Sequence, residues 1–143
     1  MPISARNCFA ARIIRIGQTA ASADVELQLP GGERIVCVVT SNRALTLRLK
    51  PGGAAHALVS AASIILTTEC ENAFRFSARN QLTGSIRQLD AGPENTEVVV
   101  ALRGGDALVA LVSNASAKEL GLTEGKAVCA MFKASSVILG VAV

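Results

Sequence analysis

Aromatic residues and long apolar runs are scarce in this chain. It has 143 residues, no Trp, no Tyr and four Phe, although half of its residues are apolar. No apolar run approaches the ~20 residues that a membrane-spanning helix needs. Arginines interrupt the N-terminal stretch where a signal peptide would have a continuous apolar core. We therefore expect no membrane partner, and we expect the surplus of aliphatic side chains to be covered by broad contacts between subunits.

Strong charge of one sign and clusters of metal ligands are also missing. The net charge is +3 and no basic run occurs, which argues against a nucleic-acid groove. The cysteines Cys8, Cys37, Cys70 and Cys129 form no C-x-x-C pair and have no histidine at metal-ligand spacing. We expect free, mostly buried thiols in a reducing cytosol, and no metal ligated directly by the protein. The single histidine, His56, is expected to be structural.

The tetrapeptide Ser-Ala-Arg-Asn occurs twice, at residues 4–7 and 77–80, which lie 73 positions apart. The same shift, without a gap, places Gly31-Gly32 on Gly104-Gly105, and it aligns apolar positions along the whole chain. Such a register indicates two copies of one unit of about 70 residues. We place the first domain at 1–69 and the second at 74–143, with a short linker around 70–73.

Each unit is predicted to be all-β. Its β-branched, partly alternating segments are typical of strands, and each glycine pair supplies the positive φ of a hairpin turn. A short polar segment before the last two strands predicts one helical turn. In the second copy Ser116 and Glu119 have capping-box spacing, and Gly121 would end the turn. The fold class is therefore two tandem OB-like, five-stranded barrels, which argues against an α/β enzyme.

Three polar motifs recur in register: the Ser-x-Arg-Asn segments, the residues before each helical turn, and the residues before each last strand. They supply hydroxyls, cations and small residues that let backbone N–H groups approach a ligand. No nucleophile–base pair is present, so we expect no enzyme. Any one motif alone is better explained by a structural role, as the cap of a strand or of a helix. Three motifs of one chemical type favour a site for a tetrahedral oxyanion.

These motifs resemble the molybdate-binding Mop domain, also called the TOBE domain. Its pattern has S-A-R-N near the start, N-A-E-V, a Gly-Gly turn, T-x-x-S, a Gly and a closing K-A-S, and the resemblance covers essentially the whole chain. It implies a tandem molbindin that binds molybdate, and often tungstate, through hydrogen bonds between units, without an organic cofactor. It also implies a homotrimer in which six units form a ring. The residues that it assigns to molybdate binding are Ser4, Arg6, Asn7, Thr40, Ser60, Ala61, Ser77, Arg79, Asn80, Ser113, Ser116, Lys133, Ala134 and Ser135.

The two copies do not match this pattern equally. The second copy keeps Lys133-Ala134-Ser135, whereas the first has Ser60-Ala61-Ala62 at the same positions. Arg43 stands where the pattern has Ser, and it could supply the missing cation. The family pattern therefore predicts two kinds of site, of which the one in the first copy is weakened, lost or rearranged.

The sequence thus predicts a cytoplasmic protein that binds molybdate or tungstate for storage, buffering or homeostasis. One alternative is an OB-like interaction module for nucleic acid or sugar, although such barrels usually present stacking aromatics on a basic face. Another is a free-standing regulatory TOBE domain. No helix-turn-helix or phosphate-loop motif accompanies the repeats.

Overall fold

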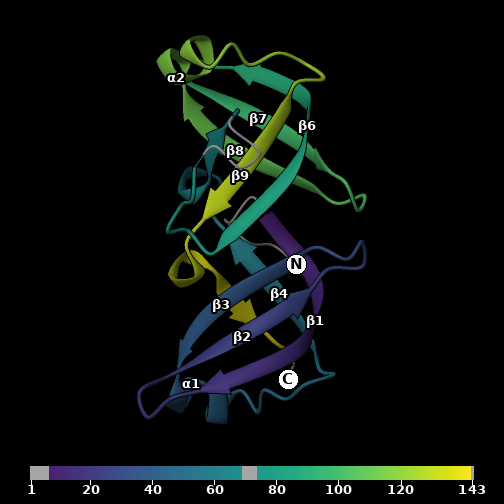
Figure 1. The fold of residues 1–143 in the computed structure, drawn as a ribbon, viewed down its shortest axis with the longest axis vertical. Coiled ribbons are helices and arrows are strands. Elements are labelled where there is room, and N and C mark those ends of the chain that lie inside the picture. Colours follow the sequence, from purple (N-terminus) through teal and green to yellow (C-terminus); the bar gives the residue numbers. More distant parts are fainter. Residues whose placement is uncertain (1–6, 69–73, 143) are drawn as a thin grey trace.

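The chain folds into two five-stranded antiparallel sheets, one above the other in Figure 1. The computed structural model describes residues 7–68 and 74–142. The first repeat forms β1 (Asn7–Gln18), β2 (Ser22–Gln28), β3 (Arg34–Thr40), α1 (Ser41–Thr46), β4 (Ala54–Val59), the 3₁₀ turn η1 (Ala61–Ser63) and β5 (Ile65–Thr67). The second forms β6 (Asn80–Ala91), β7 (Asn95–Leu102), β8 (Ala107–Ser113), α2 (Asn114–Glu119), β9 (Ala127–Phe132), η2 (Ala134–Ser136) and β10 (Ile138–Gly140).

The two sheets exchange their last strands. Their strand orders are β10-β4-β1-β2-β3 and β5-β9-β6-β7-β8. Each repeat thus contributes five strands, as the sequence predicts, but the fifth strand joins the sheet of the other repeat. The expected fold class, all-β with two OB-like five-stranded units that each have a short helical turn, is confirmed, and the units are two curled five-stranded antiparallel sheets. The expectation that each barrel closes with its own last strand is wrong, since β5 pairs with β9 and β10 pairs with β4.

The long first strand of each repeat bends so that it can pair with two neighbours. Residues 7–12 of β1 pair with β4, and residues 12–18 pair with β2. The register with β2 shifts between Ile13 and Arg15, and the register of β6 with β7 shifts at the equivalent residues Ile86 and Gln88. A bulge at this point increases the local twist, which curls each sheet around its apolar face.

A continuous apolar core fills the space inside and between the sheets. Alternate residues of β2 and β7, such as Val25, Leu27, Val98 and Val100, are fully buried, as the period of a strand requires. One buried cluster includes residues of both repeats. Some large apolar side chains among the described residues are nevertheless well exposed, namely Leu45, Ile65, Phe74 and Ile138.

The two repeats also meet through their hairpin turns. Gly31, in the β2–β3 turn, packs directly against Gly104 in the β7–β8 turn, and a Cβ at either position would overlap the other turn. The Glu33 carboxylate accepts a hydrogen bond from the Gly104 N–H at 2.6 Å. Figure 1 shows these two hairpin ends side by side.

The second helical turn begins earlier than the predicted capping box suggests. The N-cap of α2 is Ser113, whose hydroxyl accepts from the Ser116 N–H at 3.1 Å, so the predicted capping box starting at Ser116 is wrong. Thr40 caps α1 in the same way, by accepting from the Arg43 N–H. Gly121 has a φ of +62° and follows the last turn of α2, where it was expected. Within the described residues, no helix is long and apolar enough to cross a membrane.

Candidate functional site

A cavity of about 380 Å³ brings Ser77 and Lys133 together, two residues that the family pattern assigns to the anion. Ser77 lies just before β6, and Lys133 lies between β9 and η2. The other residues that line the cavity are Ser63, Ile65, Phe76, Ala78, Met131, Phe132 and Ser136. Among the described residues, no carboxylate pairs with Lys133. Lys133 is therefore the cation that this cavity offers to an anion.

The turn after Lys133 presents backbone donors beside the cavity. The Ser136 N–H donates to the Lys133 carbonyl, so the N–H groups of Ala134 and Ser135 precede the first hydrogen bond of η2. Ala134 is buried and Ser135 is exposed. The turn is held against β3 of the first repeat, where the Cys37 thiol donates to the Val137 carbonyl at 3.3 Å.

The cavity also contains a serine pair that motif comparison does not assign to the anion. Ser63 ends η1 and Ser136 ends η2, and these residues occupy the same position in the two repeats. Their recurrence in register is visible in the sequence. Their convergence on one cavity depends on the exchange of β5 and β10, which the sequence does not reveal.

Asn7 and Asn80 join the repeats. The Asn80 side chain accepts from the Val36 N–H at 2.7 Å and donates to the Val36 carbonyl at 2.9 Å. Asn7 makes the same two bonds to Val109, at 2.7 and 2.8 Å. Both asparagines are buried. In this structure their amides pair with backbone groups on the outer edges of β3 and β8. Their place in the motif therefore has a structural explanation.

Arg79 lies apart from the Ser77–Lys133 cavity. Its guanidinium pairs with Asp24 of the first repeat at 3.0 Å, and both side chains are about half exposed. Together they line a smaller cavity of about 220 Å³ with Arg15, Gly17, Glu26 and Val36. An ion pair with this exposure contributes about 0–1 kcal/mol to stability, and the carboxylates of Asp24 and Glu26 in the lining disfavour an anion here.

The remaining predicted residues are spread over the ends of β3, β4 and β8. Ser113 donates to the Ser116 hydroxyl at 2.8 Å, so these two hydroxyls do meet. Thr40 occupies the equivalent position before α1. Ser60 is exposed and Ala61 is buried at the start of η1, which packs on β8. Ser4 and Arg6 lie outside the described residues.

Neither Cys37, Cys129 nor His56 lines the Ser77–Lys133 cavity, although the Cys37 thiol holds the turn beside it. Cys37 and Cys129 are buried, as expected, but Cys8 is exposed, and Cys70 lies outside the described residues. Burial raises the pKa of the Cys37 thiol to about 11, so it stays protonated at neutral pH. His56 is half-buried in β4. No group of three or more potential metal ligands occurs among residues 7–68 and 74–142.

Comparison with known families explains the repeat. The model of the TOBE domain matches residues 3–66 and again residues 77–139. The chain belongs to the TOBE domain family. It is a tandem pair of these domains, which confirms the resemblance drawn from the motifs.

The relatives of this tandem TOBE chain carry molybdenum-related names. It is 40% identical over 141 residues to the molybdenum transport protein ModE of Azotobacter vinelandii, covering 99% of this chain and 52% of that protein. It is 36% identical over 139 residues to the molybdenum-pterin-binding protein MopA of Rhodobacter capsulatus, covering 97% of this chain and 52% of that protein. The chain thus spans about half the length of these curated relatives.

A solved structure matches the tandem TOBE chain over its whole length. It is a crystal form of the cytoplasmic molybdate-binding protein ModG with molybdate bound. The TM-score is 0.95 at 39% identity, and the match covers 99% of this chain and 100% of that one. The arrangement of the two sheets is therefore shared by a protein of the same size.

Proposed function

We propose that this tandem TOBE chain is a cytoplasmic molybdate-binding protein, and that it stores or buffers molybdate rather than catalysing a reaction. The observation that carries the proposal is the cavity in which Lys133 and Ser77 meet beside the N–H groups at the start of η2. The relatives support the ligand, because MopA is named for molybdenum and the matching ModG structure contains molybdate.

The chemistry of the site suits a tetrahedral oxyanion. Molybdate carries two negative charges, which the Lys133 ammonium partly offsets, and hydroxyl and amide donors hold its oxygens by hydrogen bonds. A charge-assisted hydrogen bond of this kind contributes about 1.5–3 kcal/mol. Tungstate has the same charge and shape and nearly the same size, so we propose that it binds equally well.

We further propose that the working form is a homotrimer with sites at subunit and domain interfaces. The exposed Ile65 and Ile138 support this assembly, since they occupy the same position in the two repeats, on the strands β5 and β10. The predicted residues are also too dispersed within one chain to surround a single anion. Ligands held between subunits would stabilise the assembly, and assembly would complete the sites.

A regulatory role is the second candidate. It is favoured by the identity to ModE, a relative that is about twice as long as this chain. In that case the tandem TOBE unit would be the molybdate-sensing part of a regulator. A knockout distinguishes the two roles: loss of storage lowers cellular molybdenum content, whereas loss of a sensor alters the molybdate response of transcription at unchanged content.

The direct test is metal analysis of protein purified from molybdate-containing medium. We expect bound molybdenum at a fixed ratio to protein, fully displaced by tungstate and poorly displaced by sulfate, which is smaller and has shorter bonds. Protein without molybdenum, or equal displacement by sulfate, would contradict the proposal and indicate a generic anion site.

A further inference from the structure

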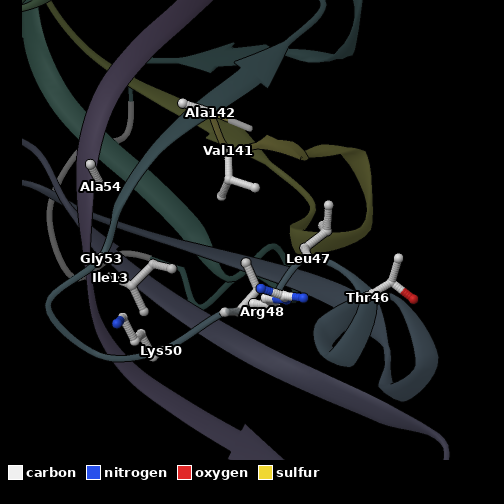
Figure 2. Close-up of a pocket in the computed structure, with 10 residues that line it drawn as sticks. Ile13, Thr46, Leu47, Arg48, Lys50, Gly53, Ala54, Val141 and Ala142 are labelled. Carbon is white, nitrogen blue, oxygen red and sulfur yellow. The ribbon is translucent and has the colours of Figure 1, made fainter.

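A cavity of about 500 Å³ lies at the end of the first repeat, under the C-terminal tail (Figure 2). Its walls come from β1, the α1–β4 connection and the residues after β10. We propose that this cavity binds a small organic anion with an apolar body, at a site separate from the oxyanion cavity. The lining residues are Ile13, Thr46, Leu47, Arg48, Leu49, Lys50, Gly53, Ala54, Val141 and Ala142.

The lining combines apolar walls with two cations. Figure 2 shows Val141 pointing into the hollow from one side, with Leu47 and Ile13 on the others. Arg48 and Lys50 provide the charge, and no carboxylate occurs among the described residues that line the cavity. Small-molecule sites typically have this volume and this mixture of apolar surface with a few polar groups.

Arg48 has a backbone conformation that non-glycine residues rarely adopt. Its φ is +54°, in the left-handed region. The equivalent residue of the second repeat is Gly121, with a φ of +62°, for which this conformation carries no steric cost. An arginine that replaces glycine at a strained position, on the wall of a cavity, is the kind of exception that occurs at ligand sites.

The backbone around the cavity is the same in both repeats. The Gly52 N–H donates to the Ile13 carbonyl at 2.7 Å, and the Gly125 N–H donates to the Ile86 carbonyl at the same distance. The turns after α1 and α2 also close with equivalent bonds. Any difference between this cavity and the equivalent region of the second repeat therefore comes from side chains.

Lys126 fills this region in the second repeat. Its ammonium donates to the carbonyls of Leu120 and Gly121, at 2.8 and 3.2 Å. The equivalent residue of the first repeat is Gly53, which leaves open the space that a lysine side chain would cross. The first repeat thus has no internal lysine here and has two cations at the wall, Arg48 and Lys50, where the second has Gly121 and Thr123.

This lining selects a ligand class. The two cations repel an organic ammonium ion and attract a carboxylate, sulfonate or phosphate group. The apolar walls contribute nothing to a small inorganic oxyanion, but they favour an aromatic or aliphatic body. Molybdate should therefore neither occupy this cavity nor compete for it.

The test uses 1-naphthoate as the probe. Because the backbone is the same in both repeats, the side chains of the second repeat guide the choice of variants. Gly53→Lys copies the second repeat and places a lysine side chain across the cavity, and Arg48→Gly removes one cation without backbone strain. In calorimetric titrations we expect Gly53→Lys to weaken naphthoate binding by more than tenfold, and Arg48→Gly by about tenfold. In the wild type, NMR shifts should concentrate on the methyl groups of Ile13 and Val141.

Two controls separate this site from nonspecific binding. Arg103→Gly removes an exposed arginine from the β7–β8 turn and should leave binding unchanged, as should saturation with molybdate. 1-Naphthylmethylammonium has a similar apolar body with the opposite charge and should not bind. The proposal is overturned if naphthoate fails to bind at millimolar concentration, if a folded Gly53→Lys variant binds it as the wild type does, or if the ammonium probe binds equally well.

Discussion

At the residue scale, polar side chains that recur in the two repeats serve different purposes. Asn80 and Asn7 belong to the motif that identifies the family, yet in this structure they hold the edge of the opposite sheet. The sequence predicts that these residues matter, because they repeat in register. It does not show whether an amide binds a ligand or a strand edge, since both uses need the same donor and acceptor.

Removing the Asn80 amide should destabilise the fold. Asn80→Ala removes a buried amide and leaves the part-buried Val36 N–H and carbonyl without this partner, which costs about 1–3 kcal/mol. Asn80→Asp should cost at least as much, because a carboxylate would face the Val36 carbonyl. Urea denaturation measures the change, with the exposed Asn42→Ala as the control. A midpoint equal to that of the wild type would show that the amide has no structural role.

At the element scale, the exchange of β5 and β10 is the feature that the sequence leaves hidden. The strands themselves are predictable from their β-branched residues and from the glycine turns. Their partners are not, because an exchanged strand keeps the same apolar pattern as one that folds back on its own sheet. The predicted capping box failed for a similar reason: Ser113 and Ser116 both fit an N-cap, and only the end of β8 decides between them.

The contact between the two hairpin turns should tolerate no side chain. A Cβ on Gly104 would collide with the Glu33 carboxylate and with Gly31. Gly104→Ala should therefore destabilise the protein by about 1–3 kcal/mol, the usual cost of overpacking. Gly17→Ala is the matched control, because its Cβ would meet nothing within 4 Å. Equal thermal midpoints for the two variants would mean that the turns do not press together in solution.

At the scale of the whole molecule, the buried core joins both repeats, so each depends on the other. The sequence indicates more aliphatic surface than the chain buries, and Ile65 and Ile138 show where part of the excess lies. It does not reveal the assembly, because the same exposed positions are compatible with several geometries. The trimer comes from family resemblance and remains a proposal.

Light scattering tests the proposed trimer. We expect a mass of three chains at micromolar concentration, and we expect Ile65→Asp with Ile138→Asp to lower it, because burying two carboxylates in an apolar interface is costly. Thr123→Asp, in an exposed loop, should leave the mass unchanged. A wild-type monomer at this concentration would contradict the assembly.

The central claim is that Lys133 serves a molybdate site, and calorimetric titration of the folded Lys133→Ala variant with molybdate tests it most directly. Loss of the ammonium leaves the negative charge of the anion unbalanced. Molybdate binding at the sites that contain Lys133, which we expect to be the tighter class, should therefore weaken by about 10–100-fold. Lys118→Ala, which removes an exposed lysine from α2, is the control and should bind as the wild type does. Ser60→Lys should strengthen the weaker class. Unchanged affinity and stoichiometry in Lys133→Ala would contradict the account.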